Sequence, residues 1–367
     1  MFLADKGAWH NLGTVVQGAR DRTEAQSISR LDWEVKKIQL FARYGNPDSP
    51  KFKPIPAWGI FRMDNGDFLS SVGASYKPVQ NDALFDMVDA LIGVEGGAHY
   101  ESAGVLGRGE KVWVAARMPY DFNVDGQDKH RTYLLGTTSH DGSSSTIWKE
   151  VVERVVCANT LGAALSENGT SLKVRHTASA DVKIEQAKKF LGQAAKTAQE
   201  VCERLTHLSH KMLDKETYIR VMDRLFPKPK TKGENGESVQ ESTARRDNVL
   251  LEIAKLFEHN DGDAFPDFRG TAFNLLNAVT EYTDHVRGVR ITEARGHNDE
   301  QRARRENAIW GTGDALKSQA MEIIMEESAG CKERPYKTYL TRALENGERD
   351  RGQDPPARSI LDDIIET

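Results

Sequence analysis

The pattern of apolar and polar positions changes near residue 180. Before that point, turn residues separate short apolar runs, which is typical of strands joined in hairpins. After it, apolar residues recur every three or four positions over long stretches, which is typical of amphipathic helices. We therefore expect an α+β protein, with an N-terminal antiparallel hairpin-rich sheet and covering helices, followed by a mostly α-helical C-terminal region.

Three hairpins are predicted in the first half. Asn65-Gly66 supplies the positive φ angles of a tight turn between AWGIFRM and FLSSVG. A second hairpin turns at 107–109, between HYESAGVL and KVWVAARM. A third turns at Asp141-Gly142, between TYLLGTTS and TIWKEVVERVV. These segments predict a meander of antiparallel strands.

Helices accompany and follow the predicted sheet. NDALFDMVDALIG begins with Asn81 as its N-cap and has one apolar face, which should cover the sheet. CANTLGAALSENG, at 157–169, predicts a second short helix, and SLKVRHT predicts a return strand. From Asp181 onwards the sequence predicts helices over 181–213, 215–226, 243–259, 271–287, 311–328 and 335–345.

Two domains fit the length of 367 residues, because a single core stops growing at roughly 250 to 300 residues. We place an α+β hairpin-rich domain at 1–180 and a helical region at 181–345. Within the helical region, PKPKTKGENGESVQES has no apolar anchors, so we expect a flexible loop at 228–243. Residues 346–367 form a polar tail.

Composition excludes several classes of protein. No run approaches the roughly 20 apolar residues of a membrane span, and the start MFLADKGAWHNLG lacks the basic and apolar parts of a signal peptide. The three cysteines are scattered without a CxxC pair, so neither a disulfide framework nor a zinc site is indicated. We expect a cytoplasmic protein with no membrane contact, no metal and no cofactor.

The net charge of -5 argues against a protein that coats nucleic acid by overall charge, so local patches must carry any such binding. One basic stretch, KVRHTASADVKIEQAKK, spans a strand end and a helix start, where backbone N–H groups attract phosphate. Trp148 lies nearby and is either a platform for a base or a core residue. The nucleic-acid-binding candidates are Trp148, Lys149, Arg154, Lys173, Arg175, His176, Lys183, Lys188 and Lys189.

A second basic stretch lies at 287–305 and is rich in arginine, which suits bidentate contacts to phosphate. For both stretches, a solvated helix face with i, i+4 ion pairs is the alternative. The sequence alone does not choose between these interpretations.

Few side chains point to catalysis. Cys157, Asn159 and His176 are the residue types of a thiol nucleophile, an orienting amide and a base, although a buried structural thiol is the alternative. GRGE at 107–110 lacks the Lys-Ser/Thr of a phosphate loop and is typical of a turn. HDGSSST at 140–146 offers hydroxyl and N–H groups for a phosphate, or is an ordinary Asp-Gly turn.

Several distinctive pieces of sequence span nearly the whole chain: GAWHNLG at 7–13, YKPVQN at 76–81, GVLGRGEKVWVAARMP at 104–119, HDGSSS at 140–145, ERVVCANTLGAAL at 153–165, VRHT at 174–177 and GTAFNLLNAVTEYTDHVRG at 270–288. Together these pieces resemble the phage- and plasmid-borne family built on domain of unknown function 932. The resemblance implies a mobile-element setting in a bacterial host cell and the two-part architecture.

The order of elements also looks like that of phage single-strand annealing proteins, which form rings or filaments and bind DNA in a basic groove. By this analogy we expect a phage- or prophage-type DNA-metabolism protein, a homo-oligomer that binds or anneals single-stranded DNA in recombination. A thiol-dependent hydrolase or transferase using Cys157 and His176 is one alternative. The other is a non-enzymatic interaction factor whose helical tail exposes Phe273, Leu276, Val279 and Val286.

Overall fold

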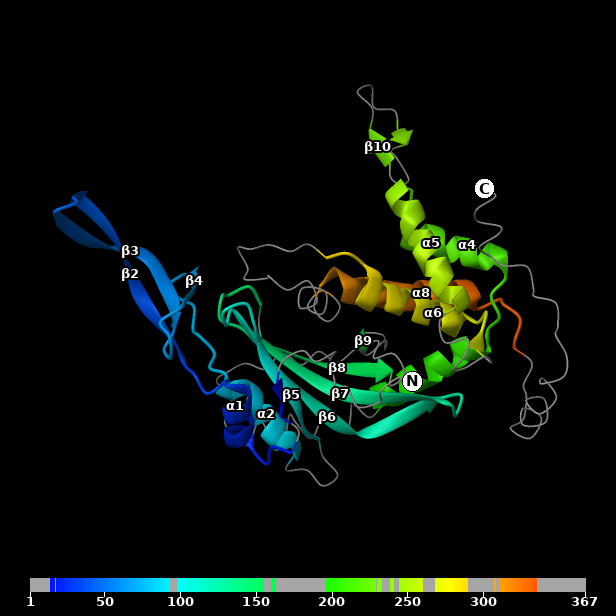
Figure 1. Cartoon of the computed structure of the whole chain (residues 1–367), viewed down its shortest axis with the longest axis horizontal. Coiled ribbons are helices and arrows are strands. Elements are labelled where there is room, and N and C mark those ends of the chain that lie inside the picture. The colour runs from blue at the N-terminus through cyan, green and yellow to red at the C-terminus, as the bar shows by residue number, and fades with distance from the viewer. Residues whose placement is uncertain are drawn as a thin grey trace. The chain divides into compact units, whose positions relative to one another are not determined.

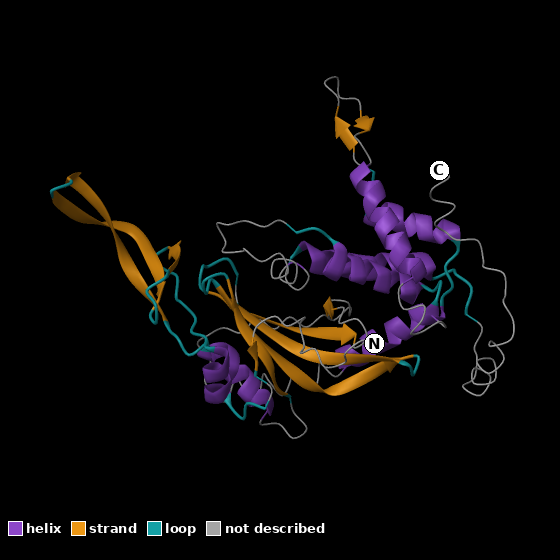
Figure 2. Cartoon of the chain, viewed as in Figure 1, coloured by secondary structure: helices purple, strands orange, loops and turns teal. Residues whose placement is uncertain are grey.

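The protein is described from a computed structural model, and its fold is α+β, as the sequence predicts (Figure 2). The chain divides into two compact units. Unit 1 comprises 1–122, 129–200 and 288–307, and unit 2 comprises 123–128, 201–287 and 308–367. The structure describes residues 14–16, 18–92, 98–144, 146–154, 160–162, 196–228, 230–232, 238–240, 244–259, 268–289, 307 and 311–334.

A six-stranded sheet contains the second and third predicted hairpins (Figure 1). Gly107 and Gly109 turn the second hairpin with φ angles of 70° and 130°, which suit glycine. Tyr133 pairs with Val151 in the third. The strands lie in the order β1 (Thr14–Val15), β5 (His99–Leu106), β6 (Lys111–Val124), β7 (Asp128–Ser139), β8 (Ile147–Arg154) and β9 (Thr160–Gly162).

Strand β9 corrects one prediction. Residues 160–162 fall in the segment expected to form a short helix, but they pair antiparallel with β8, where Leu161 lies opposite Val152. Ala and Leu of this segment are good helix formers, but helix propensity is a weak preference, and here pairing with the edge of β8 overrides it.

The core of unit 1 lies between two helices and one face of this sheet. Helix α1 (Arg22–Ser29) is capped by Asp21, and helix α2 (Asp82–Ile92) buries Leu84, Phe85 and Val88, as its apolar face predicts. Those side chains join one cluster with sheet residues that include Val114, Ala116, Leu134 and Trp148. Helix α2 and one face of the six-stranded sheet therefore pack against each other as two layers around one core.

A three-stranded sheet contains the first predicted hairpin and one that was not predicted. Its order is β2 (Val35–Asn46), β3 (Ser49–Arg62) and β4 (Phe68–Val72). Gly66, with a φ of 78°, lies in the predicted turn between β3 and β4. The long antiparallel pairing of β2 with β3 was absent from the prediction.

The helices of unit 2 lie close to their predicted bounds. Residues 196–210 are also helical, within the predicted span 181–213, and the helix predicted at 335–345 lies outside the described residues. The elements of unit 2 are α4 (Lys215–Leu225), α5 (Ala244–His259), α6 (Ala272–Glu281), the π-helix η4 (Tyr282–Val286) and α8 (Thr312–Ser328).

Unit 2 also contains a short two-stranded ladder and a largely buried apolar stripe on α6. A two-stranded ladder of β10 (Lys230–Lys232) and β11 (Ser238–Gln240) occurs within the segment that was expected to be a loop. Phe273, Leu276 and Val279 of α6 are fully buried, whereas Val286 of η4 is 39% exposed. Most of the apolar stripe considered as a partner surface is therefore core.

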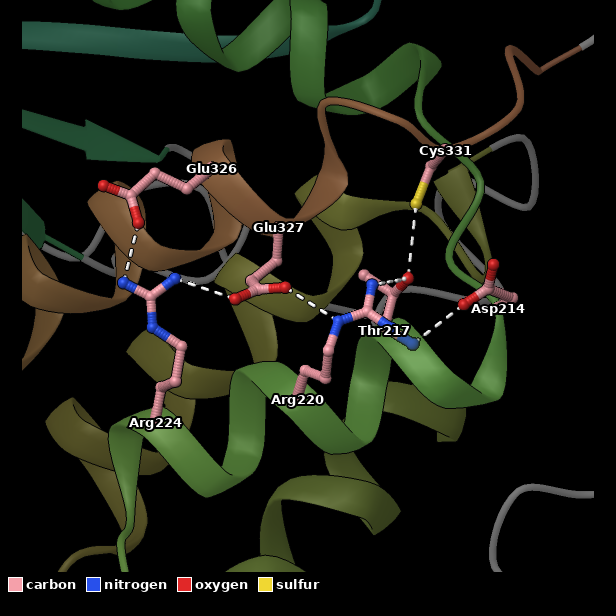
Figure 3. A network of polar contacts seen from close by, with 7 residues as sticks. All are labelled: Asp214, Thr217, Arg220, Arg224, Glu326, Glu327 and Cys331. Atoms are coloured by element: carbon pink, nitrogen blue, oxygen red, sulfur yellow. Dashed lines mark hydrogen bonds and ion pairs between the residues drawn. The ribbon is translucent and has the colours of Figure 1, made fainter.

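Ion pairs connect the helices of unit 2. Arg220 Nε lies 2.9 Å from Glu327 Oε2, and Arg224 Nη1 lies 2.8 Å from Glu327 Oε1, so one carboxylate joins α4 to α8 (Figure 3). Hydrogen bonds from Arg220 and, to a smaller extent, from Arg224 hold the pKa of the Glu327 carboxyl below its usual range. Lys317 of α8 and Asp284 of η4 form a second pair at 2.7 Å, with side chains 1% and 0% exposed.

Candidate nucleic-acid interface

Strands β2 and β3 continue beyond β4 as a two-stranded ribbon (Figure 1). Strand β4 pairs with β3 only over 58–61, whereas β2 and β3 remain paired from Phe41 opposite Pro54 to Asn46 opposite Ser49. Every residue from 41 to 54 is exposed. At a rise of about 3.3 Å per residue, the 12 residues of β2 extend for about 40 Å. We call residues 41–54 the arm.

Local polar contacts close the tip of the arm. Asn46 Oδ1 accepts the Asp48 N–H at 3.0 Å, and Arg43 Nη2 donates to the Pro47 carbonyl at 3.0 Å. Gly45 has a φ of 92°, which other residues rarely adopt. The turn is therefore specified by its own sequence.

The register of the arm places aromatic and basic side chains on both of its faces. Residues opposite each other in an antiparallel pair share a face. Arg43 lies opposite Phe52, and Tyr44 lies opposite Lys51. Because side chains alternate along a strand, Phe41 lies with the first pair and Lys53 with the second.

The three rings of the arm are unusually exposed. Phe41, Tyr44 and Phe52 have 56%, 52% and 64% of their surface exposed. Rings of this size normally contribute to a core, and exposed apolar surface rimmed by polar groups is typical of binding sites. The arm is too thin to have a core, so these rings stabilise no packing that the structure describes.

Positive charge is concentrated in the same hairpin. Residues 35–62 contain six basic side chains and one acidic one, in a chain whose net charge is -5. None of the ion pairs found among the described residues involves Arg43, Lys51 or Lys53. The arm therefore carries a local basic patch in a chain that is acidic overall. The sequence-based candidates for nucleic-acid binding lie elsewhere and do not include these residues.

The basic residues at the base of the ribbon are held by the fold. Arg62 lies over the Trp33 ring, 4.2 Å from its centroid, and Lys37 lies over the Trp58 ring at 5.0 Å. Lys37 Nζ also donates to the Tyr76 carbonyl at 2.9 Å. These contacts engage Arg62 and Lys37 with the fold, whereas Arg43, Lys51 and Lys53 of the arm are exposed.

Asn81 and His140 connect the base of the ribbon to the six-stranded sheet. Asn81 Nδ2 donates to the carbonyls of Leu31 and Trp33 at 3.1 and 3.0 Å. Its Oδ1 must therefore accept, and His140 Nε2 lies 2.9 Å from it as the donor. The side chain of Asn81 joins three segments instead of capping α2 as predicted.

His140 is a neutral, structural residue in this arrangement. Its ring is fully buried and contacts Trp33 edge-on, with 5.3 Å between ring centroids. Burial lowers the pKa of His140 to about 4, so the imidazole is uncharged at neutral pH. The loop that follows uses its own N–H groups: Ser143 donates to Asp141 Oδ1, and Ser144 donates to Ser139 Oγ. This matches the turn interpretation of HDGSSST.

The structure places three of the predicted nucleic-acid-binding residues. Trp148 is 1% exposed and belongs to the core cluster, so its ring offers no open face to a base. Arg154 is 2% exposed, and Lys149 is half-buried. The other predicted residues, Lys173, Arg175, His176, Lys183, Lys188 and Lys189, lie outside the described residues, as do Cys157, Asn159 and most of 287–305.

Glu150 is a buried acid that sequence analysis missed. It lies opposite Leu134 and is 1% exposed, and neither carboxyl oxygen has a hydrogen-bond partner among the residues that the structure describes. Burial raises its pKa to about 8, so the group is mostly protonated at pH 7. Among the described residues, no group of three or more His, Cys, Asp or Glu side chains could hold a metal ion.

Comparison with known proteins places the chain in a family. A family model described as a domain of unknown function (DUF932) matches residues 68–310. The chain belongs to the DUF932 family. The arm of this DUF932 protein precedes the matched region. Neither a curated protein nor a solved structure matches the chain. No described helix of this DUF932 protein has the length and apolarity of a membrane span.

Proposed function

We propose that this DUF932 protein is a DNA-binding protein of phage or plasmid DNA metabolism, and that the arm is a DNA contact. The observation that supports this function is the set of three exposed cations, Arg43, Lys51 and Lys53, interleaved with three exposed rings on a bare ribbon. Cations on an accessible ribbon suit the phosphate backbone, which supplies most of the affinity of nonspecific DNA binding.

The arm also explains how an acidic protein could bind DNA. The chain carries a net charge of -5, so its bulk repels phosphate. A ribbon in which residues 35–62 hold six basic side chains and one acidic one can contact phosphate although the whole chain is acidic. Screening strengthens this effect, because surface charges more than about 8 Å apart interact little at physiological salt.

A charge-reversal experiment tests the function. The variant R43E/K51E/K53E changes side chains that are exposed and make no ion pair in the described structure, so its fold should be intact apart from the hydrogen bond of Arg43 to the Pro47 carbonyl. The control R20E/K228E/K255E changes the net charge equally at exposed positions that do not belong to the arm. Fluorescence anisotropy with a labelled oligonucleotide, titrated from about 50 to 200 mM salt, measures both affinity and salt dependence.

The arm variant should bind more weakly and with a shallower salt dependence. Each lost phosphate contact lowers the slope of log K against log salt by about 0.7 to 0.9, so three contacts lower it by roughly 2 to 3. The control should keep most of the wild-type slope. Equal losses in both variants would mean that only net charge matters and that the arm is not a contact.

The remaining expectations from the sequence stand as proposals beside this one. The stretch Lys173–Lys189 would be a second phosphate contact, which charge reversal at Lys173, Arg175 and Lys189 tests in the same assay. A role in annealing and recombination, as a homo-oligomer, rests on resemblance alone. Light scattering with and without a single-stranded oligonucleotide would detect assembly on the strand.

The thiol-dependent enzyme is the competing function. It requires Cys157 to be exposed and reactive at neutral pH, which iodoacetamide labelling measures. An inert Cys157 thiol would remove this hypothesis without affecting the arm.

A further inference from the structure

The rings of the arm point to a narrower class of ligand. Resting on the proposed function, we infer that the arm binds unpaired bases, so that single-stranded DNA is its preferred ligand and duplex DNA a poor one. Phe41, Tyr44 and Phe52 are the stacking platforms, and the cations beside them contact the phosphates.

The chemistry of the rings favours bases that are not paired. In a duplex, the faces of the bases are covered by their neighbours, and only their edges are reachable from the grooves. The phenyl rings of Phe41 and Phe52 have no donor or acceptor with which to read an edge. An unpaired base offers an open face to an aromatic side chain, whatever its sequence.

The register places a ring and a cation together on each face. Opposite residues in an antiparallel pair have Cβ atoms about 4.5 to 5.5 Å apart. The side chains of Arg43 and Phe52 therefore leave the backbone at neighbouring positions on one face. The side chains of Tyr44 and Lys51 do the same on the other face. A base on the ring and its phosphate on the cation fit this spacing, and both faces of the ribbon repeat it.

A ribbon lying in the major groove of a duplex explains the same residues less well. Ribbons of two strands do fit that groove, but the side chains that read base edges there are mainly Arg, Lys, Asn and Gln. On the face that carries Arg43, the neighbours are Phe41, Phe52 and Pro54. Three apolar groups around one cation are a poor set for edge recognition.

A second copy of the arm is also a poor occupant. Packing two arms face to face would cover the rings, but it would bring Arg43, or Lys51 and Lys53, close to cations of the partner arm. Like charges placed directly opposite each other are destabilising. The sign of the charge on both faces therefore favours a polyanion over another copy.

The experiment compares a labelled oligothymidine with a labelled hairpin duplex that has the same number of phosphates, using the full chain. Three variants are made: F41A/Y44A/F52A, the leucine variant F41L/Y44L/F52L, and the control I28A/I219A/V286A. The control removes exposed apolar side chains that do not belong to the arm, which are 43%, 43% and 39% exposed. Anisotropy gives each affinity, and light scattering gives the mass of each free protein.

Loss of a stacked base costs roughly 5- to 150-fold in affinity. The wild type should prefer the oligothymidine, and the alanine variant should lose at least tenfold on it and less than twofold on the duplex. The leucine variant should lose nearly as much, because an aliphatic side chain keeps apolar area but not the flat face. The apolar control should bind both ligands like the wild type.

Other outcomes would overturn the inference in distinguishable ways. Equal losses on both ligands would mean that the rings enter a duplex, while the arm remains a DNA contact. A change in mass without a change in affinity would mean that a second copy covers the rings. If R43E/K51E/K53E also binds like the wild type, the proposed function fails together with this inference.

Discussion

Gly136 and Trp148 lie opposite each other on β7 and β8, and the indole ring covers the glycine. A Cβ at position 136 would lie 2.4 Å from Trp148 Cζ3, closer than real side chains approach. The glycine therefore creates the space in which the ring is buried. This pairing explains why Trp148 belongs to the core of unit 1 and is closed to a base.

The first prediction concerns this contact. Gly136→Ala should destabilise the protein by about 1 to 3 kcal/mol, because the added methyl overpacks a filled site. Thermal and urea unfolding would measure the loss. Gly73→Ala is the matched control, because nothing lies within 4 Å of a Cβ there. Equal stability of the two variants would contradict the packing of Trp148 over Gly136.

The buried pair of Lys317 and Asp284 gives a second prediction. Lys317→Met should cost about 3 to 5 kcal/mol in the free energy of unfolding, because it removes the buried cation that lies 2.7 Å from the buried Asp284 carboxylate. The double variant K317M/D284L should be closer to the wild type, since it removes both charges. Urea unfolding of the three proteins tests this ordering. A single variant more stable than the double would contradict it.

The network between α4 and α8 should behave differently (Figure 3). Arg220 and Arg224 have side chains that are 53% and 43% exposed, so water and salt screen their attraction to Glu327. Glu327→Gln should lower the melting temperature only slightly at low salt and not at all in about 1 M salt, where the Debye length is about 3 Å. A large loss that persists in high salt would show a packing role instead.

Glu150 should make stability depend on pH. Its pKa is about 8 in the folded protein, against 4.5 for an ordinary Glu, so the folded state binds more protons between these values and stability falls as pH rises. His140 acts in the opposite sense, because its folded pKa of about 4 lies below 6.5. The two effects oppose each other between pH 4.5 and 6.5, and of the two only the Glu150 effect continues above pH 6.5.

The wild type should therefore lose stability between pH 6.5 and 8, by up to roughly 2 kcal/mol at about 1.4 kcal/mol per pH unit. Glu150→Gln, which stays neutral, should flatten the profile in this window. Urea midpoints at several pH values would measure both proteins. Parallel profiles would show that the carboxyl is already ionised at pH 6.5.

Turn residues made the three predicted hairpins recognisable, because Asn65-Gly66, 107–109 and Asp141-Gly142 act locally. The pairing of β2 with β3 was missed although Gly45 to Asp48 is a turn signal, because Pro50, Pro54 and Pro56 argue against a strand. A two-stranded ribbon has only edges, so proline is tolerated there. The exclusion of proline from central strands therefore does not apply to the arm, whose strands pair on one side only.

Contacts between distant segments could not be predicted. Asn81 and His140 are 59 residues apart, and nothing in either local sequence indicates that they share a hydrogen bond. Burial of Glu150 and Trp148 likewise depends on which face of the sheet α2 covers. Local patterns indicated the fold class and most helix bounds, whereas the proposed DNA contact depends on the register of β2 and β3.

Prolines along β3 bear on how the arm avoids sticking to other chains. A bare ribbon with apolar rings is a template onto which a foreign strand can add, and that is how many proteins begin to form fibres. Pro50, Pro54 and Pro56 each lack the N–H that an incoming strand would need. The lysines between and beside them add mutual repulsion. The arm can therefore keep its rings accessible to a ligand without inviting fibril growth.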